Sequence, residues 1–384
     1  MDYQEYLKEK KEIYDILLKF LNCEGDEEYN VQNLFDILQK QNILKSKVEM
    51  TNFFRLLVKI SNNYHRSPEF LQKIKQILQN FIGFMKNSYT HTELFNIFKS
   101  NKPITLFLIK NQIIDINKEI VKEIIFRSQE TNTKYHHFFY PEIKKFLETQ
   151  ELENLEQELK ETDQNIMENF DLKREKGENE SFICELIRND SIEEFVIHVN
   201  QTNLSLLSTI IKPSIFETNS FLCKNNPSLI EYAAFFSSIQ IFQYLKFNNV
   251  EMKPSLWLYT IHGKNAEIIH LLEENSVQIP DNSYQTCLNE SVKCHHNEFA
   301  KYFQDNFLNE NEIDYKYEFK FFNYELIPSE LRSNSTFYYL CSYDYQEMIK
   351  LYLKQNETNL NENNNKVLYI DIFDVQFTFY LFRF

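Results

Sequence analysis

Glycine is scarce in this chain. Only 4 of the 384 residues are glycine and 8 are proline, against average usage of about 7% and 5%. The glycines lie far apart, which excludes a phosphate-binding loop of the Walker or dinucleotide type. Few glycines and prolines also disfavour turn-dense sandwiches and barrels and favour long helices. The sequence therefore predicts an all-α fold.

Long apolar runs are also missing. No stretch of about 18 uncharged apolar residues occurs, and residues 1–20 carry charges every few positions, where a signal peptide needs an apolar core. Six cysteines are scattered along the chain, a pattern typical of reduced thiols. We therefore expect no membrane partner and a cytoplasmic location, with the nucleus as the alternative.

An excess of basic charge is absent. The 41 basic residues are outnumbered by 56 acidic residues, which gives a net charge of −15. The field of such a chain repels phosphate backbones, so nucleic acid is not an expected partner. Hydrophobic residues make up 43% of the chain, which is enough to build substantial cores.

The common signatures of catalysis and metal binding are absent too. The chain has no His-Glu-x-x-His pair and no serine in a glycine-flanked elbow. Cys287, Cys294 and His295–His296 lack the paired spacing of structural zinc sites. His136–His137 lies in an aromatic run that favours a packing or helix-end role. The sequence therefore predicts no metal site, no cofactor and no enzymatic activity.

What the chain does have is helical apolar periodicity, which changes between four segments. Residues 1–140 show the pattern of successive amphipathic helices. Residues 141–180 contain 13 acidic and 6 basic residues, which predicts an acidic helix or linker. The periodic apolar pattern returns over residues 181–365. Residues 366–384 form an atypical apolar tail, for which irregular packing, a strand and an aggregation-prone terminus are alternatives.

A repeated unit is visible from residue 228 onward. Moving residues 228–254 forward by 27 positions places Ile241 on Ile268 and Leu245 on Leu272. A third copy, shifted by 31, brings Phe303 onto Leu272, and a fourth copy follows after a shift of 49. Repeats of about 20–50 residues with two helices predict a stack, because one pair cannot cover its own apolar face.

These residues resemble ankyrin repeats, in particular the divergent ankyrin-like proteins abundant in protists. Ala233–Ala234 correspond to the paired alanines of the first ankyrin helix, and Ile268–Ile269 and Leu271–Leu272 correspond to the Ile-Val and Leu-Leu pairs of the second. The resemblance is strong over residues 228–305 and weaker over residues 181–227 and 336–365.

The sequence departs from the ankyrin pattern at two places. The Thr-Pro-Leu-His opening, which ties neighbouring turns together, is replaced by segments that begin Ser228-Leu229 and Ser255-Leu256. Ser237 and Lys264 occupy the glycine position of the turn between the two helices. We therefore expect a less regular stack than consensus ankyrin repeats form.

The resemblance implies an elongated ankyrin-like α-solenoid, preceded by an N-terminal helical region, that binds a protein partner through its concave face and fingers. The residues at partner-facing positions are Phe235, Phe236, Glu251, Lys253, His262, Gly263, Gln278, Asp281, Lys293 and Cys294. For Phe235 and Phe236 the alternative is that they cover the next repeat. If they are interface anchors, alanine at both positions should leave folding largely intact.

Two other classes of function stay open. A helix in residues 141–180, with an apolar stripe that includes Leu155 and Leu159, would suit a self-assembling structural protein. An enzyme would need a site in a pocket between the N-terminal region and the stack, with convergent titratable groups. The oligomeric state is open, with a monomer favoured.

Overall fold

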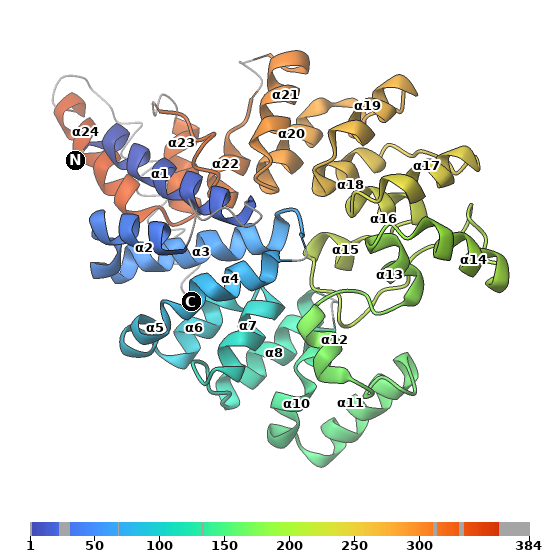
Figure 1. Cartoon of the computed structure of the whole chain (residues 1–384). Helices are drawn as coiled ribbons and strands as arrows, with labels where there is room; N and C mark the ends of the chain where they lie inside the picture. Colours follow the sequence, from blue (N-terminus) through green and yellow to red (C-terminus); the bar gives the residue numbers. More distant parts are fainter. Residues whose placement is uncertain are drawn as a thin grey trace. The chain divides into compact units, whose positions relative to one another are not determined.

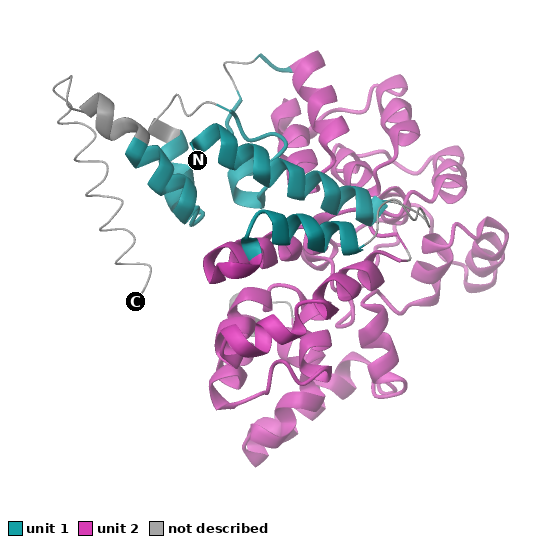
Figure 2. Cartoon of the chain, turned by 60° about the vertical axis from the view of Figure 1, so that its left-hand side comes forward, with its two compact units in different colours: residues 1–43, 308–384 teal, residues 44–307 magenta. Residues whose placement is uncertain are grey.

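A computed structural model describes residues 2–22, 31–67, 69–131, 134–309, 313–329 and 334–360. Within these ranges the secondary structure consists of α-helices and short 3₁₀ helices, with no β-strand, so the predicted all-α class is confirmed. The chain divides into two compact units, residues 1–43 with 308–384 and residues 44–307 (Figure 2). The predicted boundaries near residues 140 and 180 stay predictions, and the tail 366–384 lies outside the described residues.

The first unit joins helices from both ends of the chain. Its helices are α1 (Tyr3–Asn22), α2 (Val31–Lys40), α22 (Lys316–Phe321), α23 (Asn334–Ser342) and α24 (Gln346–Leu360). The long helix α1 packs against α2 and α24, and α23 packs against α22 and α24. The Tyr14 hydroxyl lies 3.1 Å from Oδ1 of Asn323, and the Tyr3 hydroxyl donates to the carbonyl oxygen of Pro328 at 3.0 Å. These contacts join α1 to the segment that follows α22.

The first part of the second unit consists of the helices between residues 47 and 176. They are α3 (Lys47–Asn63), α4 (Phe70–Gln79), α5 (Ile82–Ser88), α6 (His91–Phe98), α7 (Lys102–Lys110), α8 (Lys118–Thr131), α9 (Tyr135–Phe138), α10 (Tyr140–Ile143), α11 (Thr149–Thr162) and α12 (Phe170–Lys176). Helix α6 packs against α3, α7 and α8, and α4 packs against α3 and α7. Helix α7 begins after Asn101, whose side chain accepts a hydrogen bond from the Ile104 amide at 2.9 Å.

The second unit continues with helices in pairs. They are α13 (Phe182–Arg188), α14 (Ile192–Thr202), α15 (Ser220–Lys224), α16 (Leu229–Phe235), α17 (Ile239–Phe247), α18 (Leu256–Gly263), α19 (Ala266–Glu274), α20 (Tyr284–Lys293) and α21 (Asn297–Phe307). Short 3₁₀ helices are η1 (Ile43–Lys45), η2 (Lys144–Phe146) and η3 (Pro280–Asn282). The pairs are α13–α14, α16–α17, α18–α19 and α20–α21, and α13, α16, α18 and α20 pack one on the next (Figure 1).

Each pair turns through a residue with left-handed backbone geometry. The φ angles are 49° at Asp190, 58° at Ser237, 54° at Lys264 and 58° at His295. Ser237 and Lys264 therefore adopt the conformation that glycine adopts in ankyrin turns, at a cost of about 1–2 kcal/mol each. The Ser237 hydroxyl donates to the carbonyl oxygen of Gly263 at 2.6 Å. This bond ties one turn to the next helix pair.

Helices α16 and α18 approach each other closely because their facing residues are small. Ala233 and Ala234 are fully buried in α16. A Cβ atom added at Gly263 would lie far inside van der Waals contact with the backbone oxygen of Ala234. The paired alanines and this glycine therefore allow the two backbones to pack at short range, and any larger residue at 263 would separate them.

A glutamate links successive helix pairs where the sequence lacks a Thr-Pro-Leu-His motif. Glu231 accepts hydrogen bonds from the amide and the hydroxyl of Ser228, both at 2.8 Å, which forms a capping box at the start of α16. Its other carboxylate oxygen accepts from the hydroxyl of Ser255, in the next repeat, at 2.5 Å. Glu231 is only 8% exposed. The turns of these two repeats are thus tied together by a different set of side chains.

The segment predicted as an acidic helix or linker packs against the chain. Arg174 is 1% exposed and forms a bidentate pair with Glu142, at 2.7 and 3.1 Å, and a 3.0 Å hydrogen bond to the carbonyl oxygen of Phe138. Leu155 and Leu159 on α11 are buried. Their apolar stripe is therefore used inside the second unit, where it is not free to form a coiled coil.

Candidate functional site

The residues predicted to contact a partner separate into exposed and buried groups. The exposed residues are Glu251, Lys253, Gln278 and Asp281. The buried residues are Phe235, His262, Gly263 and Cys294, and the intermediate ones are Phe236 and Lys293. The exposed group lies on the connections that follow α17 and α19, whereas the buried group lies at the C-terminal ends of α16, α18 and α20.

The chain itself covers the buried group. The Phe221 ring of α15 stacks on Phe235, with centroids 6.2 Å apart and planes at 11°, and lies 4.2 Å from the His262 ring. The Lys293 ammonium group lies 5.4 Å from the centre of the same Phe221 ring. The helix ends that the ankyrin resemblance assigns to a partner are therefore occupied by α15.

The residues after α3 cover the neighbouring turns. The Tyr64 ring lies 5.1 Å from the His296 ring, and the Lys264 ammonium group lies 5.8 Å from the centre of the Tyr64 ring. Arg66 donates to the carbonyl oxygen of Gly177 at 3.0 Å and to the Thr218 hydroxyl at 2.8 Å. The segment around Tyr64 thus fastens the first helices of the second unit to its repeat pairs.

Three of the predicted residues meet in one polar chain with Glu290. The Cys294 Sγ lies 3.4 Å from Nδ1 of His262, and Nε2 of His262 lies 2.6 Å from Oε1 of Glu290. Lys293 donates to the same carboxylate oxygen at 2.6 Å. Burial opposes ionisation of Glu290, but its bonds to His262 and Lys293 outweigh burial and lower its pKa to about 2. No local motif points to Glu290, because it lies 28 residues beyond His262.

Cys294, His262 and Glu290 follow one another in the order thiol, imidazole and carboxylate. This set of side chains cannot act as a nucleophilic triad in this fold. Cys294 is 0% exposed, so a substrate cannot reach its sulfur. Burial raises the pKa of the Cys294 thiol well above its usual value, whereas a catalytic cysteine needs a lowered one. The arrangement therefore fastens α18 to α20.

The exposed side of the repeats carries an aromatic residue that the sequence pattern did not single out. Phe247, the last residue of α17, is 86% exposed, and the exposed residues Glu251 and Lys253 follow it closely. The repeat offset of 27 aligns Phe247 with Glu274, which is also exposed. A comparison of the two aligned positions could have identified Phe247 as an exposed apolar residue, since the other position carries a charged side chain.

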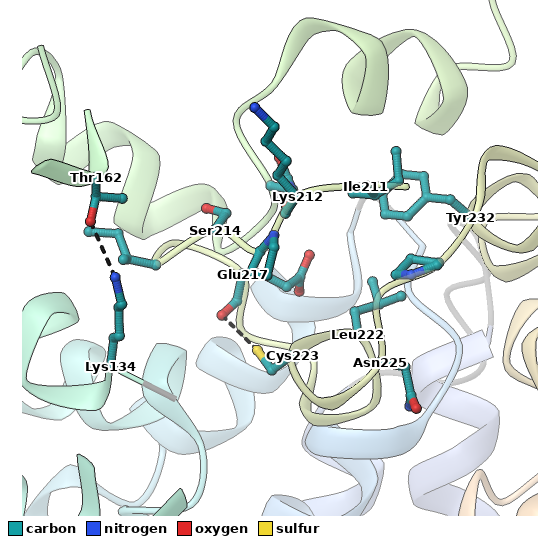
Figure 3. Close-up of a pocket in the computed structure, with 14 residues that line it drawn as sticks. Lys134, Thr162, Ile211, Lys212, Ser214, Glu217, Leu222, Cys223, Asn225 and Tyr232 are labelled. Carbon is teal, nitrogen blue, oxygen red and sulfur yellow. Dashed lines mark hydrogen bonds between the residues drawn. The ribbon is translucent and has the colours of Figure 1, made fainter. Parts of the chain in front are cut away.

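A pocket of about 270 Å³ lies between Lys134, Thr162 at the end of α11, and residues 211–232 (Figure 3). Its charged and polar lining includes Lys134, Lys212, Glu217 and Tyr232. The pocket meets the positional requirement of the enzyme alternative, because its lining includes Lys134 from the N-terminal helical region and Ile211 and Tyr232 from the segment predicted to form the stack. Whether it carries chemistry depends on how its titratable groups are bonded.

Lys134 donates to the Thr162 hydroxyl and the Tyr232 hydroxyl accepts from Arg188, whereas Glu217, Cys223 and the neighbouring Lys102 bond to backbone atoms. The Glu217 carboxylate accepts from the amides of Thr218 and Asn219 at 2.8 and 2.7 Å, and burial raises its pKa in spite of Arg66 nearby. Lys102 lies 3.3 Å from the Glu217 carbonyl oxygen, and burial lowers its pKa. The Cys223 thiol donates to that carbonyl oxygen at 3.2 Å, and burial raises its pKa (Figure 3). Among these residues no nucleophile is paired with a base.

Among the described residues, the set Cys287, Cys294, His295 and His296 does not by itself form a group of three converging ligand atoms. Cys287, Cys294, His295 and His296 are all buried in or beside α20. In the described part of the chain, two groups bring three potential ligand atoms together, and each includes a glutamate. One is the His262–Glu290–Cys294 chain, and the other joins His136 and His137 to Glu158.

Comparisons with known proteins provide no relative. No family model, no curated protein and no solved structure matches this chain. No helix of the described residues is long and apolar enough to cross a membrane.

Proposed function

We propose that this chain is a non-enzymatic, ankyrin-like helical-repeat protein that binds a protein partner through the connections between its repeats. The observation that carries the proposal is the succession of α13, α16, α18 and α20, each packed on the next and each joined to a second helix through a left-handed turn. Stacked pairs of this kind present their connections in a row, which suits binding through several moderate contacts.

The exposed connections are the part of the repeats that a partner can reach. Glu251, Lys253, Gln278 and Asp281 lie there with both signs of charge, and Phe247 stands beside the first pair. An exposed aromatic residue bordered by polar side chains is typical of an interface anchor. We therefore assign the anchor to Phe247, and we assign Phe235 to packing.

The proposal is tested by placing a photo-crosslinking residue at Gln278 and, as the matched control, at the exposed Glu267 on helix α19. We expect the Gln278 variant to give discrete protein adducts in cell extract, which the Phe247→Ala substitution reduces at least tenfold. Identical adducts from both positions, or adducts that Phe247→Ala leaves unchanged, would refute the assignment.

The two alternatives have less support. Self-assembly through residues 141–180 would need a free apolar stripe, whereas Leu155 and Leu159 are buried within their own unit. Catalysis in the pocket beside Glu217 would need a nucleophile with a lowered pKa, whereas burial raises the pKa of Cys223.

A further inference from the structure

Three potential metal ligands converge where α9 meets α11. Nε2 of His137 lies 3.2 Å from Oε2 of Glu158, and Nε2 of His136 lies 3.6 Å from the same oxygen. The ligand atoms of the three residues all lie within 4.8 Å of one another. Imidazole and carboxylate ligands bound at about 2.0–2.2 Å around a tetrahedral ion lie about 3.4 Å apart. The two measured separations bracket that value.

His137 is buried without any hydrogen bond. Its side chain is 1% exposed, and neither of its ring nitrogens has a hydrogen-bond partner. Buried polar groups are nearly always paired, so an unpaired imidazole beside a carboxylate needs an explanation. A metal ion between His137 and Glu158 would satisfy the nitrogen, because a lone pair binds a cation without needing hydrogen-bond geometry.

We propose that His136, His137 and Glu158 form a binding site for a divalent transition-metal ion of the zinc class. Two imidazoles and one carboxylate leave a fourth tetrahedral position for water or for a ligand from another molecule. The Glu158 side chain is 54% exposed, so the ion can enter from solvent. Helix α11 supplies the carboxylate, and helix α9, which directly precedes α10, supplies the imidazoles (Figure 1).

The charges around the site limit which ions it can hold. Two lysines, Lys134 and Lys102, lie close enough to His137 for their positive charges to act on its imidazole. The same lysines repel a cation, and Glu158 supplies the opposing charge. Ions that bind imidazole weakly, such as Ca²⁺ and Mg²⁺, are therefore excluded, whereas Zn²⁺ and Co²⁺ are accepted.

The second group of three potential ligands is less suited to a metal. In the His262–Glu290–Cys294 chain, one Glu290 oxygen already accepts hydrogen bonds from His262 and Lys293, each at 2.6 Å. An ion there would have to displace both donors, and the Cys294 thiol would have to lose its proton although burial raises its pKa. This group serves as an internal comparison.

The test is a Co²⁺ titration of the metal-free full-length protein, followed by visible absorption. We expect tetrahedral Co²⁺ bands that saturate at one equivalent, disappear when Zn²⁺ is added, and lack the near-ultraviolet band of a sulfur ligand. Glu158→Gln should weaken Co²⁺ binding at least tenfold. The matched control is Glu153→Gln, which changes another exposed carboxylate on α11 and should bind like the wild type.

Thermal unfolding separates loss of the site from loss of the fold. Without metal, the wild type, Glu158→Gln and Glu153→Gln should melt at the same temperature, and Zn²⁺ should raise the melting temperature of all but Glu158→Gln. The proposal is overturned by absent binding at micromolar Co²⁺, by binding that survives Glu158→Gln, or by a sulfur-to-metal band that places the ion at Cys294.

Discussion

Replacing Phe235 with alanine tests whether the ends of the first helices are a core or a binding surface. Phe235 is 4% exposed, and its ring contacts those of Phe221, Phe236 and His262 at centroid distances of 6.2, 4.9 and 5.2 Å. Its removal would leave a cavity between α15 and α18, because Phe221 and His262 come from separate helices and cannot both close the space.

The expected loss of stability is large. Truncating a buried phenylalanine to alanine costs about 3–5 kcal/mol, which combines lost transfer free energy with the cavity that remains. For a domain of this size 1 kcal/mol corresponds to about 2–4 °C, so the melting temperature should fall by roughly 6–20 °C. The measurement is urea and thermal unfolding followed by far-ultraviolet circular dichroism.

Phe247 provides the matched control, because it is the same residue type on the adjacent helix and is 86% exposed. Phe247→Ala should change the unfolding free energy by less than about 0.5 kcal/mol, as is usual for surface substitutions. If Phe235→Ala were as stable as Phe247→Ala, Phe235 would not be a core residue. Its original interpretation as a partner-binding anchor would then be favoured.

Three further predictions concern the packing of the second unit. Gly263→Ala should lower the free energy of unfolding in urea by about 1–3 kcal/mol or more, since the added Cβ clashes with the Ala234 backbone oxygen. An unchanged urea midpoint would contradict the close approach of α16 and α18. Arg174→Met should cost about 3–5 kcal/mol by stranding Glu142, and Arg174→Met with Glu142→Leu should recover most of that loss; no recovery would argue against a stranded charge. Burial lowers the pKa of His295 to about 3, so the free energy of unfolding should fall by up to about 1.4 kcal/mol per pH unit below about pH 6.5, where the unfolded chain takes up the proton. His295→Asn should flatten that slope, because asparagine tolerates the left-handed turn. An unchanged slope would refute the assignment of this pH dependence to His295.

The local features of the fold were predictable from the sequence because they depend on neighbouring residues. Apolar positions three and four residues apart indicate helices wherever they occur, and the scarcity of glycine removes most alternatives. The offset between Ile241 and Ile268 reappears as two helices, α17 and α19, that occupy equivalent places in consecutive pairs. Ser237 and Lys264, aligned with the glycine of the ankyrin turn, both adopt the left-handed conformation.

The candidate sites could not be predicted in the same way. Glu290 lies 28 residues from His262, and Glu158 lies 21 residues from His137, and neither separation corresponds to a motif. Carboxylates are frequent in this acidic chain, so only the tertiary structure shows which of them contacts an imidazole. The aromatic run around residues 136–137 favours a packing or helix-end role, and the local sequence does not show that Glu158 lies beside the pair.

The sequence by itself determined that this protein is helical, since helix formation depends on contacts between close neighbours in the chain. Only the tertiary structure decided which faces of the helices remain exposed. Phe235 and Phe247 are the same residue type on adjacent helices, yet one is 4% and the other 86% exposed. The difference arises because Phe221, in a separate helix, stacks on Phe235, whereas Phe247 ends its helix beside solvent-exposed residues.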